Sequence, residues 1–571
     1  MEKIQNIIYR NGIRLAILLF LLLLCRLAFM MANAWLYEST SVLQMGKIFF
    51  LGIKYDLFAL FVINLPYFLL TIVFRNKTGK SKKLLNSLFI LANLLNLIFI
   101  IIDIFYFPFS FQRLDLGFFQ YLTTQKNIHI LLYRFLNDYW YAAFGFLIII
   151  WGIVKANSLI DKMELKRKLF IQNKWSIYLI IGLISILSIS SFSVFPISVL
   201  KKSDAWKYAN NPFEEAAISN TSFQLLTSMF QFEDSEFDAQ VERVKHIPDS
   251  SAVFKKKNVV VFILESFTSE ASLLLNPSLK NESETGYMPF LDSLMQQSLY
   301  FTNAYANGRR SIDAVPAILA SFPAALNPIL EADYQESLPK LLKDEGYVTQ
   351  FFHGAHNGSM AFDEMCQHLE IDEYYGMDEY NQHQDFDGTW GIWDEPFLQF
   401  MLEQQSKTPK PFFSTVFNLS SHNPFVVPQE YENKSPEGGH PICRCISYSD
   451  YAISQYFSKA RLTNWYHNTI FVFTADHSAI PWNSEYYTPQ KTFSIPLFIF
   501  EPGTDLQARR TEVVQQIDIM PSILSHLNFP KSIETYGRNF FEAMKSDSVL
   551  TIINKIPQYI DGNHQVHYPK K

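Results

Sequence analysis

Residues 473–478 read Phe-Thr-Ala-Asp-His-Ser, and this stretch decides the fold because an Asp-His pair directly follows a short apolar run. A second apolar run, residues 258–264, is rich in β-branched side chains and leads into Glu265. Such runs are typical of strands buried on both faces of a parallel sheet, whose ligands bind beyond the carboxyl ends of the strands. We therefore expect Glu265, Asp476 and His477 to meet at one sheet edge and to hold a divalent metal ion.

The same alternation continues along the second half of the chain. Strand candidates are residues 259–264, 348–352, 412–418, 469–474 and 497–500. Helical patterns, such as residues 290–298 and 337–345, lie between them. Strands that alternate with helices predict an α/β domain built on a central sheet.

A candidate nucleophile lies in residues 304–313, which read Ala-Tyr-Ala-Asn-Gly-Arg-Arg-Ser-Ile-Asp. Glycine and asparagine permit a tight turn, and residues 314–321 look helical. Ser311 would then lie at a helix N-terminus, which favours the negative charge of an alkoxide or a phosphate. Arg309 and Arg310 can neutralise phosphoryl oxygens. The alternative is that Ser311 is only an N-cap, but the metal-ligand pattern on both sides favours the nucleophile.

The first third of the chain has the composition of a membrane protein. Five apolar stretches are each long enough to cross a hydrocarbon layer of ~30 Å: residues 15–36, 48–74, 85–107, 132–154 and 175–194. The first is too long for a cleaved signal peptide and should remain as an anchor. Lysine and arginine gather at the N-terminus and in loops 75–83 and 155–174, which predicts a cytoplasmic N-terminus and places everything after residue 194 outside the cytoplasm.

These patterns predict three parts. Residues 1–194 form a five-span transmembrane domain, residues 195–257 a linker with short helices, and residues 258–571 an exocytoplasmic catalytic domain. Within the membrane, Arg26 and Asp56 both fall in the outer half of the bilayer, because their spans run in opposite directions. We expect an ion pair between them and interpret it as helix pairing in preference to a lipid-substrate role.

The net charge of −6 is accompanied by no basic patch in the soluble part, so a nucleic-acid partner is not expected.

In this order, the motifs resemble the lipoteichoic acid synthase family of sulfatase-like phosphoglycerol transferases. The resemblance is carried by Glu-Ser-Phe at 265–267, a Gly-x-x-Ser turn at 308–311, Ser-His-Asn-Pro-Phe at 421–425 and the late Asp-His pair, with further signatures at 288–294, 301–306 and 516–522. It covers nearly the whole chain. It implies five membrane helices followed by an extracellular domain of the alkaline phosphatase superfamily with a central mixed sheet.

The resemblance also implies site residues. Glu265, Ser311, Asp476 and His477 match the family's metal ligands, and Ser311 also matches its nucleophile, which is usually threonine. His422 matches a histidine that contacts phosphate, and Arg310 a basic residue beside the nucleophile. The metal that the family implies is Mn²⁺, and the oxygen and nitrogen ligands also suit Mg²⁺ or Zn²⁺. Binding should weaken in mild acid, because His477 must be neutral to coordinate.

The chain departs from the family between residues 353 and 363. Where the family has a tryptophan and an arginine that hold glycerol phosphate, this chain has Met360 and Phe362. His356 and Asn357 offer other donors, and we predict that they bind substrate.

Two further features bear on the substrate. Residues 312–315 read Ile-Asp-Ala-Val and lack the x-Pro-x-Arg that directs formylglycine formation, so sulfate-ester hydrolysis is not expected. Trp390 and Trp393 fit either stacking on a sugar or lipid head group or packing in the core.

Together, the membrane pattern and the resemblance imply a multi-pass enzyme of a bacterial cytoplasmic (inner) membrane, with its catalytic domain extracellular or periplasmic. It would transfer a phosphoglycerol-type head group from a membrane phospholipid to a hydroxyl of a glycolipid, polymer or glycan through a covalent serine intermediate. The alternatives are a phosphoethanolamine transferase, a phosphodiesterase or sulfatase-like hydrolase on the same fold, and a non-catalytic envelope protein.

Overall fold

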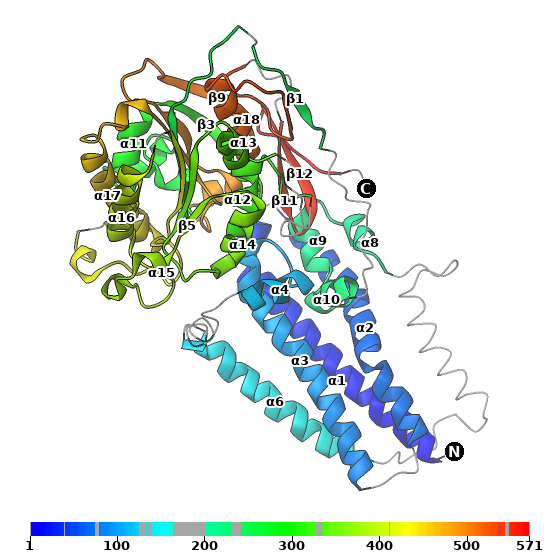
Figure 1. Ribbon diagram of the computed structural model, residues 1–571. Coiled ribbons are helices and arrows are strands. Elements are labelled where there is room, and N and C mark those ends of the chain that lie inside the picture. The colour runs from blue at the N-terminus through cyan, green and yellow to red at the C-terminus, as the bar shows by residue number, and fades with distance from the viewer. Residues whose placement is uncertain are drawn as a thin grey trace. The chain divides into compact units, whose positions relative to one another are not determined.

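The computed structural model divides the chain into two compact units (Figure 1). Unit 1 comprises residues 1–120 and 131–236, and unit 2 comprises residues 121–130 and 237–570. The structure describes residues 2–38, 40–74, 79–124, 139–163, 200–229, 241–249, 251–326, 336–409, 411–434, 436–542 and 548–569, with a few single residues between them.

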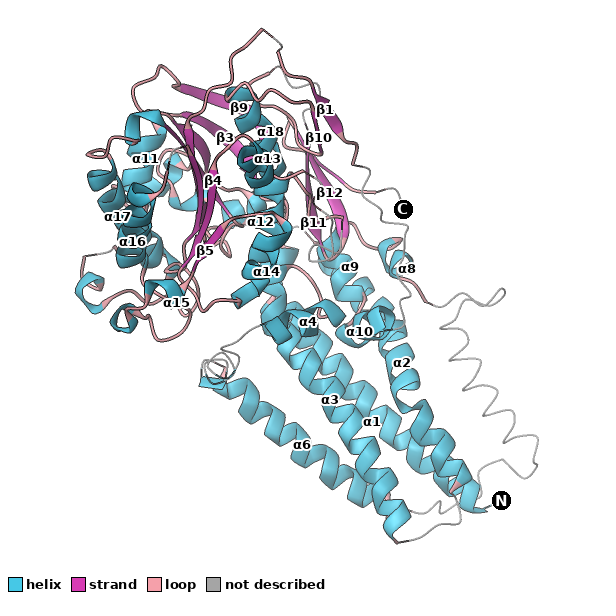
Figure 2. Cartoon of the chain, in the orientation of Figure 1, coloured by secondary structure: helices cyan, strands magenta, loops and turns pink. Residues whose placement is uncertain are grey.

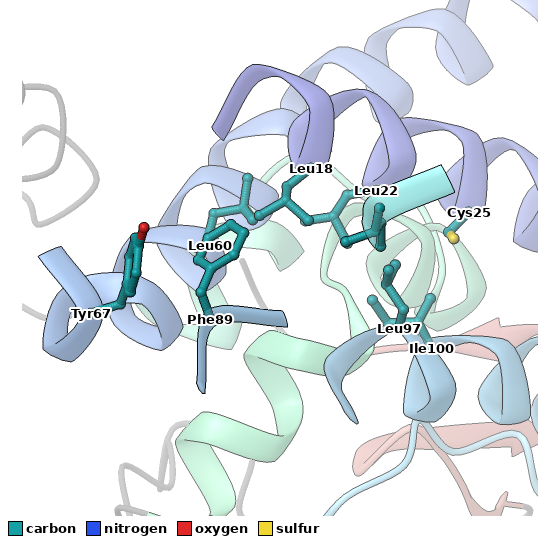
Figure 3. Close-up of a cluster of buried hydrophobic side chains, with 9 residues drawn as sticks. Leu18, Leu22, Cys25, Leu60, Tyr67, Phe89, Leu97 and Ile100 are labelled. Carbon is teal, nitrogen blue, oxygen red and sulfur yellow. The ribbon is translucent and has the colours of Figure 1, made fainter. Parts of the chain in front are cut away.

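Unit 1 contains four long apolar helices among the described residues, each able to cross a membrane by length and composition. They are α1 (Glu2–Ala32), α2 (Val42–Val73), α3 (Lys80–Ser110) and α6 (Trp140–Ile160). Leu22, Leu60 and Leu97, from three of these helices, lie in one buried apolar cluster (Figure 3). The first four predicted spans correspond to these helices. The fifth, residues 175–194, lies outside the described residues.

Two buried arginines hold the short helix α9 (Pro212–Ile218) against the apolar helices. Arg26 pairs with Asp56 through two contacts, Nη2 to Oδ1 at 2.8 Å and Nε to Oδ2 at 3.0 Å. This is the ion pair that the sequence predicted. Arg26 Nη1 also donates to the carbonyl oxygens of Ala217 and Ile218, which are among the carbonyls that a helix leaves without intrahelical partners at its C-terminus.

The second arginine repeats this arrangement. Arg113 pairs with Asp103, with 2.8 Å between Nη1 and Oδ2, and donates from Nε and Nη2 to the carbonyl oxygen of Ala216. Thr221, the first residue of α10 (Thr221–Met229), donates to Asp103 Oδ2 at 2.7 Å. Within the segment expected to be a linker, α8 (Lys202–Trp206), α9 and α10 are indeed short helices. Every residue of α9 is buried, however, because the arginines satisfy its carbonyls inside unit 1.

Replacing Arg26 with alanine should destabilise unit 1, because Asp56 would remain buried without its cation. Loss of one partner of a buried pair costs roughly 3–5 kcal/mol. The exposed pair Lys207–Asp204 is the control, and Lys207→Ala should cost less than about 1 kcal/mol. Thermal unfolding of the full chain in detergent micelles measures both. Equal midpoints for Arg26→Ala and Lys207→Ala would contradict a stabilising role of the buried pair.

Unit 2 is built on an eight-stranded sheet with the order β5-β4-β6-β2-β7-β8-β3-β9. Its strands are β2 (Asn258–Leu264), β3 (Leu299–Tyr305), β4 (Val348–His353), β5 (Glu373–Tyr375), β6 (Phe412–Phe417), β7 (Thr469–Ala475), β8 (Leu497–Phe500) and β9 (Ala508–Gln515). All neighbouring pairs are parallel except those of β8, which runs antiparallel to β7 and β3. The predicted mixed central sheet and its five predicted strands are confirmed.

Helices cover both faces of this sheet (Figure 2). On one side lie α11 (Pro289–Met295), α16 (Asp394–Lys407) and α17 (Ile442–Ala460), and on the other α12 (Ser311–Ala320), α13 (Leu338–Asp344), α14 (Phe362–His368) and α18 (Ile519–His526). Two smaller antiparallel sheets complete the unit. One pairs β1 (Val244–His246) with β10 (Ile533–Thr535), and the other contains β11 (Ser548–Ile553), β12 (Ile556–Asp561) and β13 (Val566–His567).

Candidate metal centre and active site

The ends of the two central strands bring the predicted metal ligands together. Strand β2 pairs in parallel with β7, with Leu264 opposite Ala475, so the next residue on each strand is Glu265 or Asp476. One ligand atom each from Glu265, Asp476 and His477 lie within 4.8 Å of one another. His477 Nε2 is 3.2 Å from Asp476 Oδ2 and 4.0 Å from Glu265 Oε1.

The electrostatics of this cluster fit a divalent cation. Glu265 and Asp476 are each 1% exposed. Burial, together with the negative charge of Asp476, holds the pKa of Glu265 well above its ordinary value. Burial lowers the pKa of His477, which favours the neutral imidazole that a metal binds. Asp476 Oδ2 is buried and accepts no hydrogen bond from the described residues. A cation would compensate both carboxylates and occupy this oxygen.

Ser311 is the first residue of α12, and its hydroxyl lies against the cluster. Its Oγ donates to Glu265 Oε2 at 3.3 Å, and the residue is 8% exposed. The N-cap position belongs to Arg310, so the Ser311 hydroxyl is not the cap. The turn before it requires Gly308, because a Cβ there would overlap Asp313.

The two arginines before Ser311 have different partners. Arg310 is half-buried and forms an ion pair with Asp313, with Nη2 2.6 Å from Oδ1. Arg309 is buried, and its Nη1 donates to the carbonyl oxygens of Ser478 and Thr492, both at 2.7 Å. Arg309 therefore holds the loop that follows the Asp-His pair.

His422 lies in the turn after β6. Its ring centroid is 4.1 Å from that of Trp390, whose indole N–H donates to the carbonyl oxygen of Asn423. Burial lowers the pKa of His422, and His477 and Asp476 are close enough to influence it electrostatically. Trp390 thus lies beside a predicted site residue, whereas Trp393 packs against the buried cluster around Tyr448.

His353 is a further buried histidine, close enough to His422 to be influenced by it electrostatically, and the sequence did not single it out as a candidate site residue. It is the last residue of β4 and is fully buried, with Nδ1 3.2 Å from the carbonyl oxygen of Phe417 and with no hydrogen-bond partner for Nε2 among the described residues. Burial, with a smaller effect of His422, lowers its pKa to about 4. Its position directly after the predicted strand 348–352 could have marked it as a candidate, because the other candidates also follow strand ends.

The two other predicted donors have contacts elsewhere. Asn357 Nδ2 donates to both carboxylate oxygens of Glu379 in α15 (Met377–Tyr380). The His356 ring is 5.9 Å from that of Phe386. No recorded contact among the described residues joins His356 or Asn357 to the metal cluster, and their role in substrate binding stays a prediction.

Met360 and Phe362, which stand where the family has a tryptophan and an arginine, are both buried. Phe362 packs against His353 and Phe417, with centroid distances of 5.0 Å and 5.2 Å, and Met360 is 6% exposed. Apolar side chains thus occupy both positions.

Comparison with known proteins confirms the resemblance over about half of the chain, not over nearly all of it as predicted. Residues 257–529 match the sulfatase family model. Lipoteichoic acid synthase of Staphylococcus aureus is 26% identical over 348 residues, which is 55% of this chain and 53% of the relative. The lipoteichoic acid synthase-like protein YvgJ of Bacillus subtilis is 24% identical over 318 residues, 51% of this chain and 50% of the relative. The chain spans about half the length of the curated relatives it matches.

Two solved structures are also similar. One is an alkaline phosphatase superfamily protein from Vibrio parahaemolyticus, with a TM-score of 0.48 and 24% identity, covering 58% of this chain and 83% of that protein. The other is the lipoteichoic acid synthase LtaP from Listeria monocytogenes, with a TM-score of 0.48 and 18% identity, covering 57% of this chain and 90% of that protein.

Replacing Glu265, Asp476 or His477 with alanine should remove bound metal, because each supplies a ligand atom of one cluster. Elemental analysis of the purified protein measures the metal content. Asp292→Asn is the matched control, because Asp292 is a buried carboxylate whose bonds go to Ser272 and the backbone of Leu273. Wild-type protein without metal, or equal loss of metal in Asp292→Asn, would contradict the assignment.

The affinity for Mn²⁺ should rise with pH. Below its raised pKa, Glu265 holds a proton that the cation must displace, so binding weakens as pH falls through that pKa and levels off above it. His477 contributes less, since burial lowers its pKa and keeps the ring neutral into mild acid. Calorimetric titration in two buffers of different ionisation enthalpy should show proton release in the wild type and less in Glu265→Gln. An affinity for Mn²⁺ that does not change between about pH 5 and 8 would contradict this prediction.

Proposed function

We propose that this protein is a membrane-anchored, metal-dependent transferase that moves a phosphoglycerol-type head group from a membrane phospholipid to an acceptor hydroxyl. The observation that carries the proposal is the hydrogen bond from Ser311 Oγ to Glu265, at a helix N-terminus beside the metal cluster. The similarity to proteins named lipoteichoic acid synthase supports this substrate class.

In this proposal Ser311 is the nucleophile. Its oxygen forms a bond to phosphorus while the bond from phosphorus to the diacylglycerol oxygen breaks. The serine proton is transferred to the leaving oxygen, so diacylglycerol departs as the alcohol and a phosphoglyceryl-serine remains. An acceptor hydroxyl then attacks the same phosphorus, and Ser311 leaves with a proton. The N-terminus of α12, where Ser311 lies, favours the negative charge of the phosphoryl oxygens.

Other residues of the chain support this reaction. Glu265, Asp476 and His477, with Ser311 Oγ, would hold the cation. A bound cation lowers the pKa of the serine hydroxyl and stabilises negative charge on the phosphoryl group. Mn²⁺ is the ion that the resemblance favours, and Mg²⁺ or Zn²⁺ also suits these ligands. Nδ1 of His422 donates to the carbonyl oxygen of Asn423, so the ring can donate from Nε2 to a phosphoryl oxygen only when it is protonated, and His422 stays a proposed phosphate contact. Arg310, His356 and Asn357 remain proposed substrate contacts.

Ser311→Ala should abolish transfer, on the order of 10³-fold or more, because the attacking oxygen is lost while the helix position tolerates alanine. Ser311→Thr is the matched control and should retain activity, since threonine supplies the same hydroxyl. The assay incubates full-length protein in vesicles with phosphatidylglycerol labelled in its head group and detects the label on residue 311 by mass spectrometry.

The label also separates the alternatives. An adduct that forms from labelled phosphatidylethanolamine, and not from phosphatidylglycerol, would indicate a phosphoethanolamine transferase. Release of the label by hydrolysis alone, without transfer to an acceptor, would indicate a phosphodiesterase. Near wild-type turnover by Ser311→Ala would rule out the covalent mechanism.

We further propose that the protein crosses a bacterial cytoplasmic membrane several times and carries residues 258–571 on the extracellular or periplasmic side. The lysine and arginine bias of loops 75–83 and 155–174 supports this orientation. A reporter that works only outside the cytoplasm should be active when fused after Lys571. Activity of a cytoplasm-only reporter at the same position would overturn the topology.

A further inference from the structure

Asp394 is a buried acid outside the metal cluster whose carboxylate accepts four hydrogen bonds. It is the first residue of α16 and is 3% exposed. Its Oδ1 accepts from the backbone N–H groups of Leu419 at 3.0 Å and Ser420 at 3.1 Å. Its Oδ2 accepts from Asn418 Nδ2 at 2.8 Å and Ser449 Oγ at 2.6 Å. The carboxylate therefore connects α16 with the end of β6 and with α17.

The first connection continues to a metal ligand. Asn418 directs its Nδ2 to Asp394, and its Oδ1 accepts from the backbone N–H of Glu265 at 2.7 Å. An amide has one donor end and one acceptor end, so the bond to Asp394 fixes which end faces Glu265. Asp394 thereby sets the hydrogen bond that positions the Glu265 backbone.

The second connection continues to the predicted phosphate contact. Asp394 holds the N–H groups of Leu419 and Ser420, and the carbonyl oxygen of Leu419 accepts from the N–H of His422 at 3.0 Å. Ser421, which lies between Ser420 and His422, donates from Oγ to the carbonyl oxygen of Glu265 at 2.6 Å. The turn that carries His422 is thus held by Asp394 on one side and joined to Glu265 on the other.

We propose that Asp394 is a positioning residue that sets the geometry of Glu265 and His422 through Asn418 and the turn 419–422. The inference rests on the proposed function, because it assigns a purpose to Asp394 through the metal ligand Glu265. Residues that orient metal ligands from outside the coordination sphere typically change metal affinity by about 10- to 100-fold when mutated.

Asp450 provides a matched control. It is also a buried acid that is 3% exposed, and it follows Ser449 in α17. Its carboxylate accepts from the N–H groups of Phe290 at 2.9 Å and Leu291 at 2.8 Å, at the start of α11. Its recorded hydrogen bonds involve neither Asn418, Glu265 nor His422. Loss of its charge therefore tests general destabilisation without a change at the metal ligands.

The experiment compares Asp394→Asn and Asp450→Asn in the full-length protein in detergent micelles. Mn²⁺ is titrated into metal-free protein and free Mn²⁺ is followed by its paramagnetic resonance signal, while thermal unfolding of the metal-free protein reports stability. Asp394→Asn should raise the Kd for Mn²⁺ about 10- to 100-fold. Asp450→Asn should leave this Kd within about 2-fold while lowering the unfolding midpoint, because its effect is on stability alone.

A Kd within about 3-fold of wild type for Asp394→Asn would overturn the inference, since that is below the range expected of a positioning residue. Equal weakening by Asp450→Asn would also overturn it. Wild-type protein that binds no Mn²⁺ would instead overturn the metal site of the proposed function, and the inference with it. If Asp394→Asn loses the Ser311 adduct but keeps the wild-type affinity for Mn²⁺, the inference is also overturned, because Asp394 would then not position Glu265.

If Asp394→Asn does not fold, Asn418→Ala interrupts the same connection while leaving three bonds of Asp394 in place. It should weaken Mn²⁺ binding by a similar factor, and wild-type affinity in this variant would overturn the inference. Where both single variants fold, the double variant should bind Mn²⁺ no more weakly than the single variant with the lower affinity, because both changes interrupt one connection.

Discussion

Glu265 and Asp476 are buried carboxylates at the ends of adjacent strands, and their mutual repulsion is the constraint on which the site depends. Burial and the neighbouring charge keep the pKa of Glu265 high, so the metal-free cluster favours a bound proton. A divalent cation would remove this penalty, with the neutral ring of His477 as a further proposed ligand. The Ser311 hydroxyl reaches the same cluster through Glu265. The proposed metal site and the proposed nucleophile would therefore be linked through one side chain.

The strand register creates this pair. Parallel pairing of β2 with β7 sets Leu264 opposite Ala475, and a slip of one residue would turn the alternating side chains to opposite faces. Both strands are buried along their whole length, so the close packing of their side chains on both faces of the sheet holds this register. The apolar runs that made these strands predictable are thus also what specifies the distance between the carboxylates.

Buried runs and strand-end charges were readable from the sequence, whereas interactions set by distant backbone were not. The pair Arg26–Asp56 was predictable because membrane depth places both residues at one level. The role of Arg113 was not, because it depends on where the carbonyl oxygen of Ala216 lies. Likewise, β9 was missed because its first half is largely exposed and polar. Asn357 has the side chain of a substrate contact, but only the fold shows its bonds to Glu379.

Buried acids have different partners in the two units, and this difference supports a ligand site in unit 2. In unit 1, Asp56 and Asp103 each pair with an arginine that also binds the end of α9, so their charges are compensated within the protein. In unit 2, Asp394 is surrounded by hydrogen-bond donors from the protein. Asp476 Oδ2 is buried and accepts no hydrogen bond from the described residues, although the buried Arg309, which donates from Nη1 to neighbouring loops, interacts with Asp476 electrostatically. A buried charge without full compensation is costly. The unsatisfied Asp476 oxygen fits a ligand that is itself positive, and this supports the proposal of a metal site at this sheet edge.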